Sequence, residues 1–366
     1  MSLPFGNFRP TPPARYRSVR TILIAAVLSG LAASCAPVQH RAMTDPSLPS
    51  APLVIAHRGA SGERPEHTIA SYTLAIRQGA DVIEPDLVPT KDDVLVARHE
   101  NEISETTDVA QHPEFADRCT TKTIDGQTLT GWFVEDFTLA ELKTLRAKER
   151  LPQLRPANAA YDGQETIPTF AEVIALAKAH GVGIYPETKH PTYFASIGHP
   201  TDELVVTALR EAGWDSAQAP VYLQSFEVDN LKRLAKMTKV RLIQLVAGEG
   251  APADGAAPSY AAMMTPAGLH AVAKYAYGIG PDKAMLWSGD AASSLVKDAH
   301  EAGLRVHPWT YRAENYFLRA PFRRGTDPRA HGDLAGEIRA ALDQGIDGFF
   351  TDFPAIGVAA RGRETK

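Results

Sequence analysis

The feature that most constrains the fold of this chain is a regular alternation of short apolar segments and longer amphipathic segments after residue 52. Each short segment is a continuous apolar run, which is typical of a parallel strand buried on both faces. Each longer segment has apolar residues three and four positions apart, which predicts a helix. The predicted strands lie at residues 53–57, 81–88, 182–187, 221–226, 240–246, 275–280, 304–310 and 347–353.

Eight strand–helix units within roughly 300 residues predict an α/β fold of one closed barrel, the (β/α)8 or TIM barrel, over residues 51–360. An open doubly wound sheet is the alternative, because it also alternates strands and helices. No glycine-rich phosphate loop follows the first predicted strand, which counts against a dinucleotide-binding domain.

A segment of roughly ninety residues between the second and third predicted strands is much longer than one crossover connection requires. Residues 94–100 predict an extra strand, and residues 101–165 contain polar turns, one predicted helix (LAELKTLRA) and a proline-rich run. Because Trp132, Phe133 and Phe137 need burial, we expect a packed insertion over the mouth of the barrel.

The first 36 residues predict an export signal. Three arginines (Arg15, Arg17 and Arg20) precede the apolar run TILIAAVLSGLAASC, which is too short to span a membrane. The run ends in Ala-Ala-Ser-Cys, which resembles a bacterial lipobox, so we expect Cys35 to be lipidated in the periplasm. A polar tether would then cover residues 37–50.

The lipobox prefers leucine three residues before the cysteine, where this chain has Ala32. The alternative is an export signal that is simply cleaved, in which Cys35 is not modified. The other cysteine, Cys119, could pair with Cys35 in an exported protein, but lipidation of Cys35 would leave it as a free thiol. With two cysteines, no cysteine-based metal site is possible.

The net charge of -5 argues against nucleic-acid binding and against a generally basic, membrane-binding surface. We therefore expect membrane contact only through the lipid anchor. The sequence does not define an oligomeric state.

Polar residues gather at the carboxyl ends of the predicted strands, the face on which TIM barrels hold their active sites. Along the chain these residues are His57, Arg58, Glu84, Asp86, His99 on the extra strand, Glu187, Lys189, Gln224, His307, Trp309 and Asp352.

Glu84 and Asp86 are two residues apart, so both point to the same side of one strand. Together with Glu187 they would repel one another unless a cation lay between them, and such oxygen ligands suit Ca²⁺ or Mg²⁺ better than zinc. Arg58 and Lys189 add the positive charge that a phosphate oxyanion requires.

His57 and His99 flank this set and could exchange protons with attacking and leaving oxygens. Each residue also has a structural interpretation: a strand histidine is often only hydrogen-bonded, and the acidic residues could form a solvated pair or an ion pair. His67 stands beside Thr68 at a predicted helix start, where we expect capping and no catalysis. The joint pattern at successive strand ends favours the functional interpretation.

These motifs resemble those of the glycerophosphodiester phosphodiesterase family, in its exported bacterial branch. The resemblance covers residues 53–357, and HRG followed in order by E-x-D, a histidine and a distant E-x-K is specific. The matching segments are HRGASGERPEHT (57–68), EPDLVPTKDDVLVARHE (84–100), PETKHP (186–191), VYLQSF (221–226), YGIGPD (277–282), VHPWT (306–310) and GFFTDFP (348–354).

The resemblance implies a TIM barrel with a small insertion after strand two. It implies hydrolysis of glycerophosphodiesters, such as glycerophosphocholine, to sn-glycerol 3-phosphate and an alcohol, with one divalent cation, Ca²⁺ in preference to Mg²⁺. The implied roles are acid and base for His57 and His99, metal ligation for Glu84, Asp86 and Glu187, phosphate binding for Arg58 and Lys189, and a substrate pocket of Gln224, Phe226 and Trp309.

The chain departs from the family pattern at Glu100, where aspartate commonly follows the second histidine; a longer arm could still orient His99. The basic, proline-rich part of the insertion, ERLPQLRPANAAYDG, could alter which alcohol fits. Two other classes stay open: a surface lipoprotein with a binding or adhesion role on the same barrel, and a barrel glycosidase using Glu84 and Glu187, which would not need the arginine and lysine.

Overall fold

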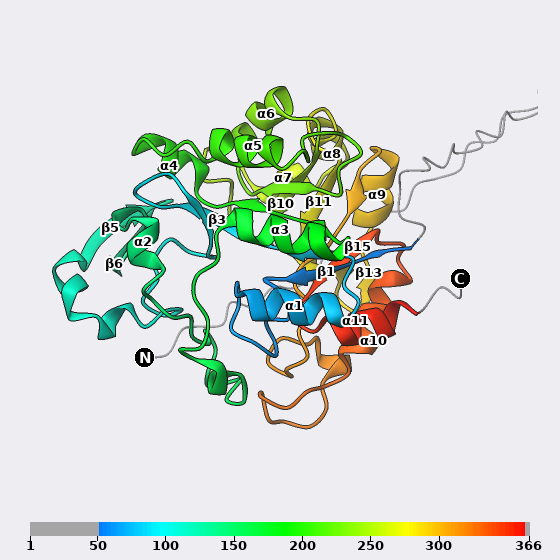
Figure 1. The fold of residues 1–366 in the computed structure, drawn as a ribbon. Helices are drawn as coiled ribbons and strands as arrows, with labels where there is room; N and C mark the ends of the chain where they lie inside the picture. Colours follow the sequence, from blue (N-terminus) through cyan, green and yellow to red (C-terminus); the bar gives the residue numbers. More distant parts are fainter. Residues whose placement is uncertain (1–50, 363–366) are drawn as a thin grey trace, which may run out of the picture. The chain divides into compact units, whose positions relative to one another are not determined.

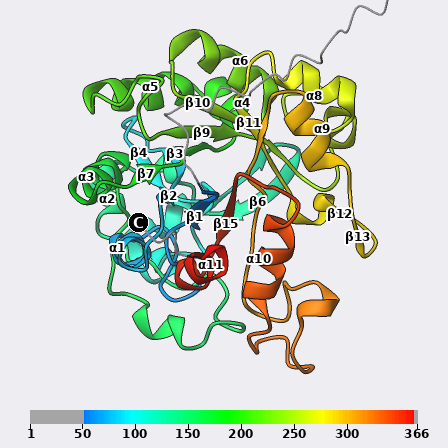
Figure 2. The ribbon, with the colours of Figure 1, turned by 90° about the vertical axis from the view of Figure 1, so that its right-hand side faces the viewer.

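The computed structural model describes residues 51–362, so the predicted export signal, Cys35 and the tether lie outside the described residues. Strands surround the core and helices cover them from outside (Figures 1 and 2). The barrel strands are β1 (Leu53–His57), β2 (Val82–Glu84), β3 (Asp86–Pro89), β7 (Gly183–Ile184), β8 (Glu187–Thr188), β9 (Tyr222–Ser225), β10 (Arg241–Val246), β11 (Gly278–Pro281), β14 (Arg305–Val306) and β15 (Gly348–Thr351).

The strands pair in the orders β15–β1–β2–β7 and β14–β11–β10–β9–β8–β3. The second and third predicted strands each form in two pieces, because Pro85 and Pro186 have no backbone N–H to continue the ladder. Past β14, the N–H of Tyr311 donates to the carbonyl of Phe350 at 2.8 Å and joins β15. The ring closes with eight strand positions, and the predicted TIM barrel is confirmed.

The outer helices begin close to where the sequence predicts them. The hydroxyls of Thr68 and Thr169 cap the first two by accepting hydrogen bonds from the amides of Ser71 and Glu172. The outer helices are α1 (Ile69–Arg77), α3 (Phe170–His180), α5 (Thr201–Glu211), α6 (Val228–Met237), α8 (Pro266–Val272), α9 (Leu295–Glu301), α10 (Leu334–Leu342) and α11 (Pro354–Arg361).

Aromatic and aliphatic side chains fill the barrel interior, including Tyr185, Tyr222 and Phe350. His307, which we expected at the mouth, lies in this interior, where its Nδ1 is 2.8 Å from the hydroxyl of Tyr185. The side chain is 2% exposed and packs against Gly348 at the start of β15, near the amino ends of the strands. The expectation for His307 was therefore wrong.

The insertion between β3 and β7 has its own apolar cluster, which includes Phe137. Phe133 and Phe137 are both fully buried. Trp132 is half-buried and donates its indole N–H to the carbonyl of Phe115 at 2.6 Å. The extra strand β4 (Leu95–Ala97) pairs antiparallel with β3. The insertion also contains a hairpin that the sequence did not predict, formed by β5 (Thr120–Ile124) and β6 (Gln127–Gly131) (Figure 1). Helix α2 (Leu139–Leu142) is shorter than predicted.

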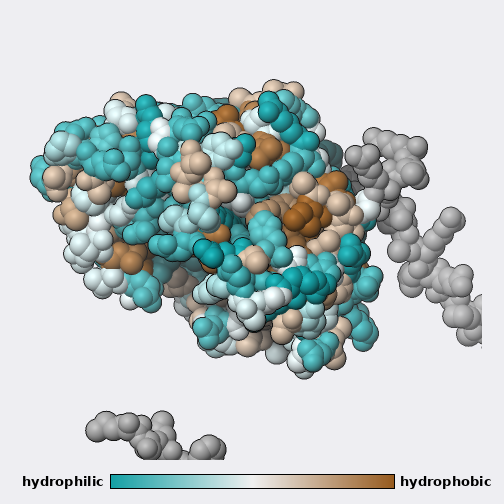
Figure 3. Space-filling model, turned by 90° about the horizontal axis from the view of Figure 1, so that it is seen from below, coloured by the Kyte–Doolittle hydropathy of each residue, from teal (hydrophilic) through white to brown (hydrophobic). Residues whose placement is uncertain are grey.

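Short elements follow three of the barrel strands: α4 (Pro191–Ser196) follows β8, α7 (Tyr260–Met263) follows β10, and β12 (Trp287–Ser288) and β13 (Ala291–Ala292) follow β11. Figure 3 shows one face of the molecule, on which hydrophilic residues predominate and apolar residues form separate patches. None of the helices in residues 51–362 combines the length and the apolar character that a membrane span needs.

Candidate active site

The strand register brings the predicted site residues side by side. His57 lies opposite Glu84 on β2, Asp86 on β3 lies opposite Glu187 on β8, and Glu187 lies opposite Gln224 on β9. His57, Glu84 and Gln224 stand at or near the carboxyl ends of β1, β2 and β9. Asp86 and Glu187 begin β3 and β8, the second pieces of the second and third predicted strands. Residues distant in the chain therefore meet at the mouth of the barrel, as the sequence predicted.

Three carboxylates form a cluster that could hold one metal ion. One oxygen from each of Glu84, Asp86 and Glu187 lies within 4.8 Å of the others, and all three side chains are buried. The donors are carboxylate oxygens, with no histidine or thiol among them, which suits a hard cation such as Ca²⁺ or Mg²⁺.

Burial and mutual repulsion act strongly on this cluster. Burial and then the charge of Asp86 raise the pKa of Glu84 well above its usual range, and burial raises the pKa of Glu187 to about 8. Burial also opposes ionisation of Asp86, but Lys189 and nearby cationic groups hold its pKa well below its usual range. A divalent cation between the three groups would favour their ionised forms, so the residues present fit such an ion.

Arg58 is held rigidly beside this cluster. Its backbone is left-handed, with φ 57°, and its N–H donates to the carboxylate of Glu84 at 2.8 Å. Its guanidinium contacts Glu66 at 3.0 Å and Asp86 at 3.3 Å. The sparsely populated backbone conformation is maintained by these contacts and points the cation at the cavity mouth.

Lys189 also lies beside the cluster, with Nζ 3.0 Å from Oε1 of Glu187. Its ammonium is also 5.8 Å from the centroid of the Phe226 ring. Phe226 packs edge-on against Trp309 at 5.8 Å, and the indole N–H of Trp309 donates to the carbonyl of Gly280 at 2.7 Å. The predicted substrate-pocket aromatics therefore have fixed orientations.

Each of the two predicted acid/base histidines is bound at Nδ1 by a carboxylate. Nδ1 of His57 is 2.6 Å from Oδ1 of Asp352, and Nδ1 of His99 pairs with Glu100. This leaves Nε2 of each ring available for proton exchange. Burial, followed by the charge of Arg58, lowers the pKa of His57 to about 4 and that of His99 to about 3.

A cavity of about 320 Å³ collects these groups at the barrel mouth. Among the residues with a predicted catalytic, metal-binding or substrate-binding role, only Asp86 does not line this cavity; its carboxylate contacts Arg58 and His67. The lining residues are His57, Arg58, Glu84, His99, Glu187, Lys189, Gln224, Phe226, Leu245, Trp309, Thr310, Arg312 and Phe350.

Sequence reasoning missed an arginine layer around the site. Arg155 of the insertion donates to Oδ2 of Asp352 at 2.6 Å, and Arg312 contacts the same oxygen at 3.0 Å. Arg150, also from the insertion, contacts both Glu66 and Glu100. The basic, proline-rich run was the sequence feature that could have indicated these contacts. The acidic residues that its arginines contact are distant in sequence, so they could not be identified from it.

His67 has a different role from the one expected. Thr68 caps α1, whereas the fully buried His67 ring contacts Asp86 through Nε2 at 2.9 Å and the hydroxyl of Tyr72 through Nδ1 at 2.7 Å. His67 therefore supports a predicted metal ligand from behind and does not line the cavity.

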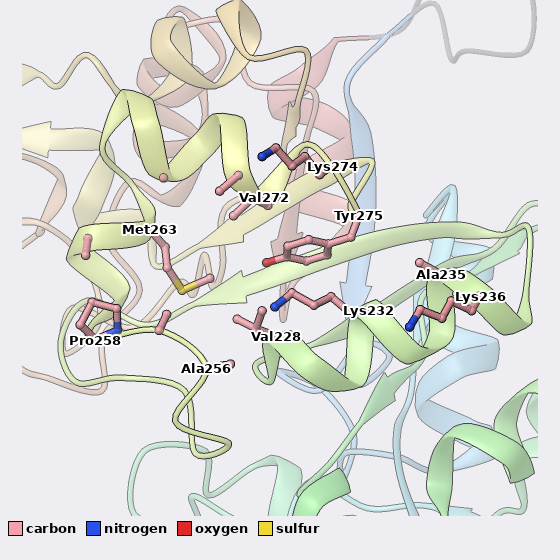
Figure 4. A pocket seen from close by; sticks show the side chains of 14 residues that line it. Val228, Lys232, Ala235, Lys236, Ala256, Pro258, Met263, Val272, Lys274 and Tyr275 are labelled. Carbon is pink, nitrogen blue, oxygen red and sulfur yellow. The ribbon is translucent and has the colours of Figure 1, made fainter.

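A larger cavity, of about 690 Å³, lies between α6 and α8 on the outside of the barrel (Figure 4). Its walls are mostly alanine, valine and methionine, with Lys232, Lys236, Lys274 and Tyr275 as polar groups. It has no carboxylate or imidazole in its lining, so the acid/base and metal-binding chemistry lies in the smaller cavity.

Comparison with known proteins gives a consistent result. A model of the glycerophosphoryl diester phosphodiesterase family matches residues 57–356. Glycerophosphodiester phosphodiesterase GDPD6 of Arabidopsis thaliana is 36% identical over 355 residues, covering 89% of this chain and 92% of that protein. The glycerophosphodiester phosphodiesterase of Haemophilus influenzae is 31% identical over 376 residues, covering 93% and 98%.

Solved structures show the same fold. A phosphodiesterase of Oleispira antarctica, in complex with the product sn-glycerol-3-phosphate, matches with a TM-score of 0.58 and 23% identity over 85% of this chain and 96% of its own. A glycerophosphodiester phosphodiesterase of Agrobacterium tumefaciens matches with a TM-score of 0.55 and 19% identity over 84% and 99%. The chain belongs to the glycerophosphoryl diester phosphodiesterase family and is an enzyme of that class.

Proposed function

We propose that this enzyme hydrolyses glycerophosphodiesters to sn-glycerol 3-phosphate and an alcohol, with the help of one divalent cation. The observation that carries the proposal is the single cavity of about 320 Å³ lined by two histidines, three cationic side chains and two of the three clustered carboxylates. A phosphodiester placed there meets groups for proton transfer and for charge neutralisation at once.

His57 and His99 act as the proton-transfer pair. Both rings are neutral at pH 7 in the absence of substrate, because their pKa values are lowered, and each can accept a proton at Nε2. One neutral ring accepts a proton from the attacking water at Nε2. The other ring takes up a proton at Nε2 when the anionic phosphodiester binds beside it, and it gives that proton to the departing alcohol oxygen. Asp352 and Glu100 hold the rings in one tautomer and stabilise each imidazolium as it forms.

Arg58 and Lys189 bind the non-bridging phosphate oxygens beside the carboxylate cluster. Gln224 donates to Glu84 at 3.1 Å, while its buried Oε1 has no hydrogen-bond partner among the described residues. A hydroxyl of the glycerol moiety would satisfy that oxygen. Phe226 and Trp309 cover the apolar side of the pocket.

Glu84, Asp86 and Glu187 would hold the cation, which would supply Lewis-acid stabilisation of charge on the phosphate. We propose Ca²⁺ in preference to Mg²⁺, because Ca²⁺ tolerates the irregular, carboxylate-rich geometry that three residues from three strands provide.

The test is release of glycerol 3-phosphate from a panel of glycerophosphodiesters, after chelation and after return of Ca²⁺ or Mg²⁺. We expect activity that a chelator abolishes and Ca²⁺ restores better than Mg²⁺. No release from any substrate would favour the alternative, a surface lipoprotein with a binding or adhesion role. Hydrolysis of glycosides that is insensitive to chelator would favour the glycosidase.

We also propose that the enzyme is exported to the periplasm and anchored to a membrane through a lipid on Cys35. The basic residues and short apolar run before Ala-Ala-Ser-Cys support this proposal.

A further inference from the structure

A second cavity, of about 260 Å³, adjoins the active-site cavity and shares Glu187, Lys189 and Phe226 with it. The turn of the β5–β6 hairpin contributes Asp125, and the residue before α6 contributes Glu227. Because this cavity opens beside the site where the phosphodiester reacts, it is placed to receive one of the two groups esterified to the phosphate.

Glu227 is a buried carboxylate without a cationic partner. It is 2% exposed, and its oxygens accept hydrogen bonds from the N–H of Thr192, at 3.2 Å, and from the hydroxyl of the same residue. Within residues 51–362, no lysine, arginine or histidine lies within 4.0 Å of it as an ion pair. A buried charge of this kind is costly, and a cationic ligand would compensate it.

The other charges of the cavity are already paired or negative. Lys189 contacts Glu187, and His190 lies 2.6 Å from Asp125. Burial raises the pKa of Glu227 to about 7, and the charges of Asp125 and Asp254 act in the same direction. The cavity therefore favours a positive ligand and disfavours a second anion.

Two aromatic rings form part of the cavity wall. Phe226 and Tyr260 lie with their ring centroids 6.1 Å apart at 70°, and both line the cavity. Aromatic faces attract alkylammonium groups, which are weakly hydrated and bind poorly to small polar sites. A cavity that holds both an unpaired carboxylate and two aromatic rings is therefore suited to an organic cation.

We propose that this cavity is the subsite for the leaving alcohol and that it selects alcohols with an ammonium group, such as choline or ethanolamine. The inference rests on the proposed function. The positive group lies between Glu227 and the rings of Phe226 and Tyr260, with Asp125 at the entrance. A neutral alcohol such as glycerol would leave Glu227 without a counter-charge.

The first test compares kcat/KM for glycerophosphocholine and for glycerophosphoglycerol. Glu227→Gln keeps the acceptor for Thr192 but removes the charge. We expect the ratio of the two constants to fall by roughly tenfold to a hundredfold, mainly through KM for glycerophosphocholine. Glu249→Gln makes the same charge change on the exposed loop after β10 and should keep the wild-type ratio.

Asp125→Asn, at the hairpin turn, provides a second variant in case Glu227→Gln does not fold. Its side chain is 27% exposed, so we expect a smaller fall in the same ratio. An unchanged ratio in both folded variants would overturn the inference, as would a wild-type enzyme that does not prefer the cationic substrate.

A binding measurement separates the subsite from the proposed reaction. By titration calorimetry, the wild type should bind choline and should not bind 3,3-dimethylbutan-1-ol, its neutral isostere, and Glu227→Gln should bind choline at least tenfold more weakly. Equal binding of the two alcohols would contradict the subsite even if hydrolysis is confirmed. Choline binding without hydrolysis of any glycerophosphodiester would support the subsite and overturn the proposed function.

Discussion

At the scale of single residues, proton transfer depends on which ring nitrogen each histidine presents to the cavity. Carboxylates occupy Nδ1 of both His57 and His99, so Nε2 is the reactive atom in each ring. Arg58 stays charged at any working pH and cannot take the place of either histidine as a base.

We predict that His57→Asn and His99→Asn each lower kcat by about 10²- to 10⁴-fold, the contribution typical of a positioned acid or base. Metal affinity should change little, because neither histidine belongs to the carboxylate cluster. Steady-state kinetics on glycerophosphocholine measure the loss. Near-wild-type kcat in both variants would contradict the two-histidine mechanism.

An aryl phosphodiester distinguishes the acid from the base. A nitrophenolate leaves without being protonated, whereas an alkoxide does not. The variant that lacks the general acid should therefore recover much more activity on this substrate than the variant that lacks the base. Equal recovery of both variants would argue against separate roles.

The sequence predicted which residues gather at the candidate site but not which residues contact them and hold them in position. His57, Glu84 and Glu187 follow apolar runs, so their places at strand ends could be predicted locally. The contact between His57 and Asp352 joins residues 295 positions apart and depends on closure of the barrel by β15 beside β1. Likewise, no periodic pattern indicates that the buried His67 contacts Asp86.

At the scale of elements, the insertion is attached to the active site by buried arginines. Arg155 is 8% exposed and bridges Glu314 and Asp352, with both contacts at 2.6 Å, and it also donates to the carbonyl of Ser61 at 2.9 Å. Through Arg155, the proline-rich run therefore positions the carboxylate of Asp352, which in turn contacts His57.

We predict that Arg155→Met destabilises the fold by about 3–5 kcal/mol, because it leaves two buried carboxylates without one of their partners. It should also lower kcat, because Asp352 loses a contact that positions His57. Chemical denaturation and kinetics measure the two effects. Arg329→Met removes an exposed ion pair with Asp327 and should leave stability close to that of the wild type; a similar loss in both variants would refute the bridging role.

Elements of the insertion were harder to predict than those of the barrel. The barrel strands are buried apolar runs, whereas the β5–β6 hairpin reads Thr-Thr-Lys-Thr and is mostly exposed. The Asp125-Gly126 pair at its turn was the sequence feature that could have predicted the hairpin, and both residues have positive φ, as such a turn requires. Helix α2 ends early at Leu142, since the following segment turns to pair Ala147 with Thr107.

At the scale of the whole molecule, we predict that the mature chain begins at a lipidated Cys35. The apolar run before it is too short for a membrane span and ends in small residues, which is typical of a cleaved signal. Mass spectrometry of the mature N-terminus tests this. An unmodified N-terminus at another residue would contradict lipidation and leave export standing.

The carboxylate cluster also links metal binding to the pH dependence of stability. Burial raises the pKa of Glu187 from 4.5 to about 8, so in the absence of a cation the folded state holds this proton more tightly than the unfolded state. Its contribution to stability is complete below pH 4.5 and is lost as pH rises through about 8. Glu84, whose pKa is also raised, acts in the same direction.

We therefore predict that Ca²⁺ or Mg²⁺ raises Tm, and that the rise is larger at pH 8 than at pH 5, because the cation replaces protons on these carboxylates. A cation that binds only the folded state adds about 2.7 kcal/mol at a hundredfold excess over Kd. Thermal unfolding at both pH values, with cation and with chelator, measures the effect. The double variant Glu84→Gln/Asp86→Asn should lose the shift; if it shows the same shift as the wild type, the cation binds elsewhere.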